Sequence, residues 1–142
     1  MAKKKILILC TGNSCRSQMA EGYLRQFAGE RAEIYSAGVE VHGVNPRAVA
    51  VMKEDGIDIS GHTSDHIDKY NEIDLDIVIT VCDKAKESCP YFPTKALKFH
   101  RNFPDPAKVT GSEAHIDEQF RKIRDLIKDH FRQFAEEHIP RP

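Results

Sequence analysis

A cysteine and an arginine in the arrangement C-x5-R stand near the N-terminus, between an apolar run and a helical pattern. They are Cys10 and Arg16, in the segment LCTGNSCRS at residues 9–17. The backbone N–H groups of this loop can turn inward, and the positive end of the following helix adds to their field, which favours a tetrahedral oxyanion. Arg16 could hold two anion oxygens with its planar guanidinium group. The same dipoles favour a thiolate, so we expect a nucleophilic Cys10 with a pKa below the usual value of about 8.5.

Two ordinary interpretations compete with this one. Cys10 could be a buried small apolar residue at a strand end, because free cysteine is among the most buried residue types. A zinc site is the second, since Cys10 and Cys15 fall within common ligand spacing. Cys82 and Cys89 are more widely spaced than usual ligands, and zinc does not explain the anion loop. The combination C-x5-R-S between a strand and a helix favours catalysis.

The composition indicates the class of protein that carries this loop. With 142 residues, 40% of them hydrophobic and 30% charged, the chain predicts one globular domain over residues 1–142. A net charge of -1 argues against nucleic-acid and membrane surfaces as partners. No signal-peptide or membrane-span pattern follows the basic residues 3–5, so we expect a cytoplasmic protein. Thiols stay reduced in that compartment, so catalytic or metal-binding cysteines are expected rather than disulfides.

The elements that must position Cys10 alternate between strand and helix patterns. Continuous apolar runs at residues 6–10 and 77–82 are typical of strands covered on both faces, and 32–38 and the segment near Leu97 give two more. This alternation predicts an α/β fold, a four-stranded parallel sheet with helices on both faces. Ligands of such sheets bind outside the carboxyl ends of the strands, where Cys10 is expected.

Two helix starts carry recognisable capping signals. Asn45 and Pro46 predict an N-cap and a first helical position, with Gly56 beyond the end of that helix. Thr110 and Glu113 predict a capping box at the start of the last helix.

Residues 10–17, followed by Met19-Ala20-Glu21, resemble the anion loop shared by low-molecular-weight protein tyrosine phosphatases and thioredoxin-coupled arsenate reductases. The resemblance extends to residues 36–38, to Asp105-Pro106 and to the closing helix, and so covers nearly the whole chain. It implies the fold of those phosphatases and a substrate-binding loop. That loop would consist of Thr11, Gly12, Asn13, Ser14, Cys15, Arg16 and Ser17.

The remaining cysteines separate the two families. Hydrolysis of a phosphate ester needs one thiol and no electrons, whereas reduction of arsenate takes two electrons, which two thiols supply by forming a disulfide. The positions of Cys10, Cys82 and Cys89 match the reductases. A low-molecular-weight protein tyrosine phosphatase remains the alternative, although its usual aromatic residues after Asp-Pro are replaced here by Ala107 and Lys108.

The resemblance to the reductases implies a relay of thiols. Cys10 would attack arsenate held by the loop and Arg16, with Asp105 protonating the leaving oxygen. Cys82 would then attack Cys10 as arsenite departs, and Cys89 would attack Cys82, giving a disulfide that thioredoxin reduces. We also expect a short helix after Cys82 that must unwind, because its ends would be about 10 Å apart and a disulfide tolerates about 7 Å between Cα atoms.

Some relatives among the reductases bind a potassium ion near the loop. The matching, oxygen-bearing positions are Asn13, Glu21, Ser36, Thr63 and Asp65. Each also has an ordinary structural explanation. His62 is expected either to approach Cys82 or to be an ordinary turn histidine. The implied partners are arsenate, with phosphate or sulfate as mimics, and thioredoxin, and the protein is expected to be a monomer.

Overall fold

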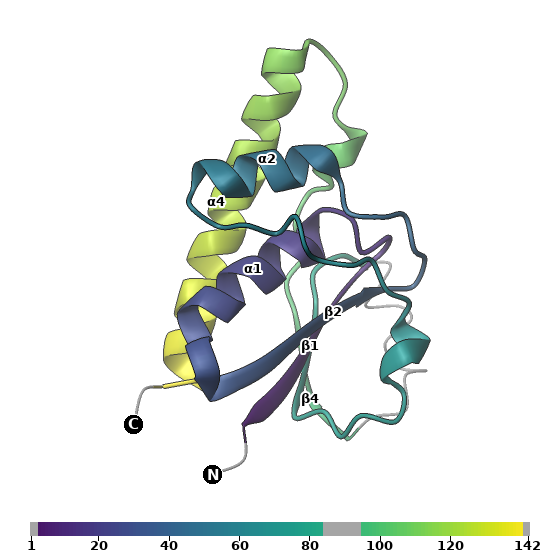
Figure 1. Cartoon of the computed structure of the whole chain (residues 1–142), viewed down its shortest axis with the longest axis vertical. Helices are drawn as coiled ribbons and strands as arrows, with labels where there is room; N and C mark the ends of the chain where they lie inside the picture. The colour runs from purple at the N-terminus through teal and green to yellow at the C-terminus, as the bar shows by residue number, and fades with distance from the viewer. Residues whose placement is uncertain (1–2, 84–94, 141–142) are drawn as a thin grey trace.

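Four strands form one parallel sheet in the order β2-β1-β3-β4 (Figure 1). The computed structural model describes residues 3–83 and 95–140. The strand predicted at residues 77–82 is two residues shorter in the structure, because its pairing with β1 and β4 ends at Thr80. The strands are β1 (Lys4–Cys10), β2 (Ala32–Gly38), β3 (Ile77–Thr80) and β4 (Leu97–His100).

The position of β1 inside the sheet explains why its sequence is apolar without alternation. Ile6, Leu7, Ile8 and Leu9 are all fully buried, since elements cover both faces of the sheet. The chain leaves β1 for β2 on one side, and β3 lies on the other side. The carboxyl end of β1 therefore faces the point where the strand order reverses, which is where ligands of such sheets bind.

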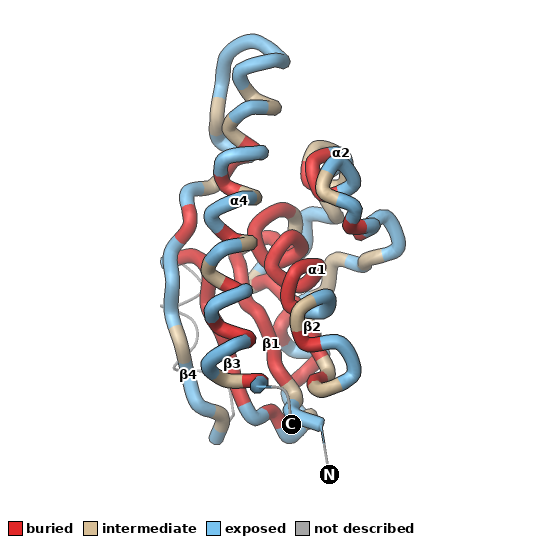
Figure 2. The backbone as a smooth tube through the Cα atoms, turned by 90° about the vertical axis from the view of Figure 1, so that its left-hand side faces the viewer, coloured by how far each residue is buried: buried red, intermediate tan, exposed pale blue. Residues whose placement is uncertain are grey.

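Within the described residues, three α-helices pack against one another, and much of the buried core lies between them and the sheet (Figure 2). The ring of Phe99 in β4 contacts Phe134 and His138 at centroid distances of 5.4 and 4.7 Å, so the last helix covers the face that Phe99 occupies. The described helices are α1 (Arg16–Ala28), α2 (Pro46–Glu54) and α4 (Glu113–His138), with short 3-10 helices η1 (Gly29–Arg31), η2 (Ile67–Tyr70) and η4 (Pro106–Lys108).

The opposite face of the sheet is covered at β2 by η2. The strand register places Tyr35 on the face away from Phe99, and the Tyr35 ring contacts Tyr70 at 5.3 Å between centroids. Helical elements thus lie on both faces, as predicted, with α-helices on one face and a 3-10 helix on the other within the described residues. No helix in the described ranges has both the length and the apolarity needed to cross a membrane.

The predicted start of α2 is confirmed. The Asn45 side chain accepts hydrogen bonds from the backbone N–H groups of Arg47 and Ala48, and Pro46 occupies the first helical position. Gly56 follows the helix with a φ of 78°, a left-handed conformation that glycine adopts without strain.

The predicted capping box at the start of α4 is wrong. Ser112 is the N-cap, and its hydroxyl accepts the N–H of His115 at 3.1 Å. Glu113 is therefore the first helical residue instead of the third, and its carboxylate pairs with Arg47 of α2. Between Thr110 and the helix lies Gly111 with a φ of 130°, so the chain is still turning where the box would begin.

Candidate active site

The loop between β1 and α1 surrounds a cavity of about 430 Å³ at the carboxyl edge of the sheet. Five of the predicted substrate-binding residues line it together with Cys10 and Cys82: Thr11, Gly12, Ser14, Cys15 and Arg16. A larger cavity of about 530 Å³, lined in part by Phe27 and Ile139, lies by the far end of α1 and contains none of the predicted site residues. The site is identified by its chemistry, not by its volume.

Two residues fix the shape of the loop. Asn13 has a φ of 49°, which asparagine tolerates better than most side chains. At Gly12 an added Cβ would lie 2.3 Å from Nδ1 of His42, so a side chain there would require that ring to move. The loop carbonyls accept hydrogen bonds from residues 40–45. These bonds join Glu40 N–H to Thr11 at 2.8 Å, His42 N–H to Gly12 at 3.0 Å and Asn45 N–H to Ser14 at 3.1 Å.

Asn13 and Ser17 lie beneath the loop rather than in the cavity. The Asn13 amide donates to the hydroxyls of Ser17 at 2.8 Å and Ser36 at 3.0 Å, and its oxygen accepts the N–H of Asp65 at 2.7 Å. The backbone N–H of Ser17 does reach the site, because it bonds to the Cys10 sulfur. The side chains of Asn13 and Ser17 therefore support the loop.

The structure brings Arg16 and Asp105, both predicted to act on the substrate, to 3.6 Å between Nη2 and Oδ2. Arg16 also donates to the carbonyl of Phe103 at 3.0 Å, and the N–H of Ala107 holds the other oxygen of Asp105 at 3.0 Å. The buried Nε of Arg16 has no hydrogen-bond partner among the residues that the structure describes. An unpaired buried N–H costs about 1–3 kcal/mol, so a bound oxyanion that accepted from it would be favoured.

The thiols of Cys10 and Cys82 are hydrogen-bonded to each other, and both residues are only 3% exposed. The Cys82 sulfur also lies 3.1 Å from the hydroxyl oxygen of Thr11. Side chains 72 positions apart in the chain meet because β1 and β3 are neighbouring parallel strands. Two thiols in contact can form a disulfide with little backbone movement.

Contact with the Cys82 thiol, followed by burial, raises the pKa of Cys10 well above its usual value, against the lowering effects of the Arg16 charge and the Ser17 N–H. The predicted lowering of this pKa is therefore wrong for the site with both thiols in contact. The sequence argument expected Cys82 to reach Cys10, but it counted only the local dipoles and left out the effect of the Cys82 thiol on the pKa of Cys10.

Cys15 lines the cavity but is not poised to react. Burial raises its pKa to about 11, and its sulfur lies 3.9 Å from the Ser14 hydroxyl. Cys89 and the predicted helix after Cys82 lie outside the described residues. Within the described ranges, no three His, Cys, Asp or Glu side chains form a metal-binding group, which gives the zinc interpretation no support there.

His62 does not approach Cys82. Its Nδ1 lies 2.9 Å from the Gln18 amide oxygen and its Nε2 lies 3.4 Å from the Glu21 carboxylate. Burial lowers the pKa of His62, against the opposing effect of Glu21. His62 thus belongs to a polar cluster behind the anion loop, in which it contacts Gln18 and Glu21.

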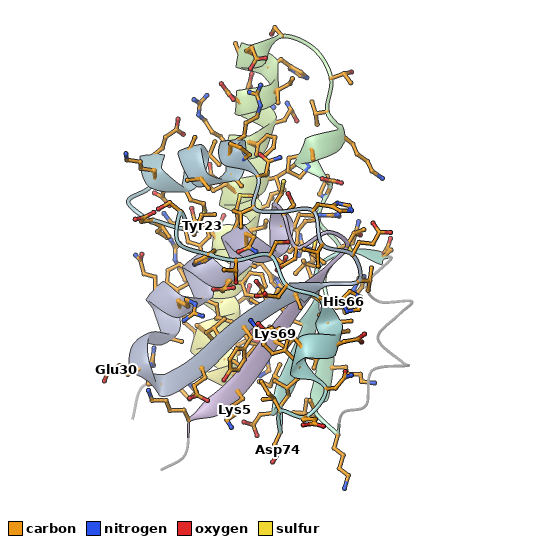
Figure 3. The ribbon with its side chains drawn as sticks, turned by 45° about the vertical axis from the view of Figure 1, so that its right-hand side comes forward. Lys5, Tyr23, Glu30, His66, Lys69 and Asp74 are labelled. Atoms are coloured by element: carbon orange, nitrogen blue, oxygen red, sulfur yellow. The ribbon has the colours of Figure 1, made fainter. Side chains whose placement is uncertain are left out.

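The predicted potassium ligands gather in this cluster. Glu21 accepts from the Ser36 hydroxyl at 2.6 Å, and Thr63 donates to Asp65 at 2.8 Å. These four line a cavity of about 350 Å³, and Asn13 joins them through its bonds to Ser36 and Asp65. Cationic side chains also border it: Arg25, 2.8 Å from Glu21, and Lys69, 3.3 Å from Asp65 (Figure 3).

Sequence reasoning missed two histidines near the site. His42 lies against Gly12, with its Nε2 2.9 Å from the Glu40 carboxylate. His100, on β4, bonds to Asp83, the residue after Cys82, at 2.9 Å. Neither has a local signal, because each is brought to the site by pairing between distant segments.

Residues 5–141 match the family model described as low molecular weight phosphotyrosine protein phosphatase. This chain is 48% identical to the arsenate reductase of Bacillus subtilis and 49% identical to that of Halalkalibacterium halodurans. Each match covers 96% of this chain and 98% of the relative. Arsenate reductase 1 of Staphylococcus epidermidis is 50% identical over 95% of this chain and 98% of its own.

Solved structures of arsenate reductases and of a tyrosine phosphatase are also similar to this chain. An arsenate reductase in the phosphate binding state superposes with a TM-score of 0.80 at 34% identity, and one in an oxidized state with 0.81 at 32%. Each covers 94% of this chain and 98% of the other. A low molecular weight protein tyrosine phosphatase from T. tengcongensis gives a TM-score of 0.79 at 26% identity, covering 95% of this chain and 99% of its own.

Proposed function

Because the chain belongs to the low-molecular-weight phosphotyrosine protein phosphatase family, we propose that its loop performs thiol chemistry on a tetrahedral oxyanion, and that this chemistry is the reduction of arsenate to arsenite. The contact between the Cys10 and Cys82 thiols carries the proposal. A hydrolase needs one thiol, whereas a reductase must supply two electrons from a pair. The names of the relatives at 48–50% identity support the same choice.

In the first step, Cys10 as thiolate attacks the arsenic of an arsenate held by the loop. Arg16 neutralises the charge of the anion, and Asp105, 3.6 Å from Arg16, gives a proton to the departing oxygen, which leaves as water. The sulfur–arsenic bond forms as the arsenic–oxygen bond breaks, so arsenic remains pentavalent.

In the second step, the Cys82 thiolate attacks the sulfur of Cys10. The sulfur–sulfur bond forms, the sulfur–arsenic bond breaks, and its electron pair stays on arsenic, which leaves as trivalent arsenite. Cys89 then attacks Cys82, and the proposed partner thioredoxin reduces the new disulfide. This cycle depends on thiols that are kept reduced, as in the cytoplasm.

The test is a coupled assay with arsenate, thioredoxin, thioredoxin reductase and NADPH, in which the loss of NADPH is followed. Consumption of NADPH that needs arsenate, and that disappears in Cys10→Ser, is expected. Replacing thioredoxin with glutaredoxin and glutathione should give little turnover. Absence of arsenate-dependent NADPH loss from the fully reduced wild type contradicts the proposal.

A phosphatase active on aryl phosphates is the second candidate, favoured by the family itself and by the structural likeness to a tyrosine phosphatase. The wall of the cavity favours a smaller substrate. Ala107 and Lys108 line it after the Asp-Pro pair, so no aromatic side chain from these two positions packs against a phenyl ring. Hydrolysis of an aryl phosphate faster than arsenate turnover would favour the phosphatase.

The proposal includes a potassium ion in the cluster behind the loop. The donor set suits a hard cation, because Glu21 and Asp65 supply carboxylates and Asn13, Ser36 and Thr63 supply neutral oxygens. Arg25 and Lys69 already neutralise the two carboxylates in part, which favours a monovalent ion over a divalent one. Such an ion would stabilise Asn13 and therefore the loop.

A further inference from the structure

His100 joins the two sides of Cys82. One ring nitrogen, Nδ1, lies 2.7 Å from the hydroxyl oxygen of Thr80, two residues before Cys82. The other, Nε2, lies 2.9 Å from Oδ1 of Asp83, one residue after it. A single imidazole therefore ties the chain on both sides of the second cysteine of the site.

The sheet explains how His100 reaches both positions. Thr80 and His100 are register partners at the ends of β3 and β4. Beyond them Val81 is held from both sides, since its N–H donates to Leu9 of β1 at 2.9 Å and its carbonyl accepts from Phe103, in the segment after β4, at 3.0 Å. The backbone up to Val81 is thus fixed by the sheet, and the His100–Asp83 bond extends that restraint past Cys82.

We propose that His100 is a positioning residue for Cys82, acting through Asp83 to keep the Cys82 sulfur beside Cys10. The inference rests on the proposed function, because it concerns the step in which Cys82 attacks the Cys10 sulfur of the arsenic adduct. In that step the sulfur–sulfur bond forms and the electron pair of the sulfur–arsenic bond stays on arsenic. His100 exchanges no proton or electron in it.

The two ends of this link differ in strength. Thr80 is only 2% exposed, so its contact with the ring is shielded from water. The Asp83 side chain is 71% exposed and that of His100 is 24% exposed, and a polar contact so open to solvent is weak. The Asp83 end is therefore the one that releases when Cys82 has to leave Cys10 and meet the next thiol.

The first experiment measures one turnover without thioredoxin. Reduced protein is mixed with excess arsenate, quenched with acid, and the fraction carrying the Cys10–Cys82 disulfide is followed by mass spectrometry. Because a freer attacking thiol has a lower effective concentration, His100→Ala and Asp83→Ala should each slow this step, by roughly fivefold or more. The double variant should be no slower than the slower single one, since both remove the same link.

Controls separate this effect from general damage. Asp68→Ala removes an exposed carboxylate that also pairs with a histidine, His66, at 3.4 Å, and it should leave the rate unchanged. Phosphate binding, measured as the rise in melting temperature that phosphate produces, should be the same in His100→Ala as in the wild type. If that variant does not fold, Asp83→Ala, with its exposed side chain, carries the test.

A second readout needs no arsenate. Alkylation of Cys82 by iodoacetamide, mapped by peptide, should be faster in both variants, while alkylation of Cys15 should not change. Equal disulfide rates in the wild type and both variants would overturn the role of His100. Loss of phosphate binding in step with the rate would also overturn it, as general damage. Failure of the wild type itself to form the disulfide with arsenate would instead overturn the proposed function.

Discussion

At the scale of single residues, Cys10 and Cys82 have different duties in one contact. Cys10 stands at the end of β1, with the Ser17 N–H on its sulfur, whereas Cys82 is held by Thr11 and by Cys10 itself. Only the first belongs to the anion loop. The two cysteines should therefore respond differently to substitution, according to whether a reaction needs a nucleophile or an electron pair.

We expect Cys10→Ser to abolish arsenate reduction and any hydrolysis of aryl phosphates, by roughly three orders of magnitude or more, because both need its thiolate. Cys82→Ser and Cys89→Ser should abolish sustained reduction and spare hydrolysis. NADPH loss with thioredoxin and release of nitrophenol from its phosphate measure the two activities. Wild-type arsenate turnover in Cys89→Ser would contradict the relay.

The contact also sets the acidity of Cys10. Since Cys82 is the largest cause of the raised pKa, Cys82→Ala should lower the pKa of Cys10 and shift the pH profile of its alkylation to lower pH. The rate of iodoacetamide modification against pH, mapped to the peptide that contains Cys10, measures this. Cys15→Ala, at the same loop, is the control and should leave the profile in place.

These residues also mark how far sequence reasoning reaches. Arg16 and Asp105 could be assigned to the same site because the family resemblance covers both positions, although their contact with each other was not predicted. The raised pKa of Cys10 and the role of His100 could not be predicted from local sequence, since each depends on a neighbour from another strand. Local pattern identifies a reactive residue but does not specify what the fold packs against it.

At the scale of elements, what was predicted best is what depends on adjacent residues. The strand at residues 32–38 has the predicted bounds, and Asn45 caps α2 because its amide oxygen accepts from backbone N–H groups of the first turn. The cap of α4 was misplaced by two residues, because Thr110 and Ser112 are both good caps and the turn at Gly111 decides between them. Propensity alone does not separate two competent caps.

That choice is testable by stability. Ser112→Ala should reduce the free energy of unfolding by about 1 kcal/mol, because the N–H of His115 loses its acceptor. Thr110→Ala, the matched control, should change it by less than about 0.5 kcal/mol. Urea unfolding of the two variants and the wild type measures both values. A larger loss from Thr110→Ala would restore the capping box.

At the scale of the whole molecule, the order of the strands brings the residues of the site together. The chain ends lie at the foot of the sheet, where Lys4 donates to the carbonyl of His138 at 2.9 Å, and the loop with Cys10 lies at the opposite edge (Figure 1). The parallel fold gathers β1, the end of β3 and the segment after β4 at that edge. A cation bound behind the loop would therefore be expected to stabilise the whole folded protein.

If potassium binds the folded state alone, it should raise the melting temperature with its concentration, by roughly 3 °C for each 1 kcal/mol of binding free energy. Sodium at equal ionic strength removes the effect of screening. Glu21→Gln should abolish the difference between the salts, whereas Glu30→Gln, on a side chain that points away from the molecule, should keep it (Figure 3). Identical melting in both salts would exclude potassium.

The close packing of Gly12 under His42 has a consequence for heredity. A Cβ at position 12 would overlap the His42 ring, so no amino-acid replacement there is compatible with the ring in its present place. A lineage that replaced His42 with a smaller residue would remove this barrier, and substitutions at position 12 would then become tolerable in that background. Which substitutions are accepted at position 12 should therefore depend on the residue at position 42, and on the order in which the two changes arise.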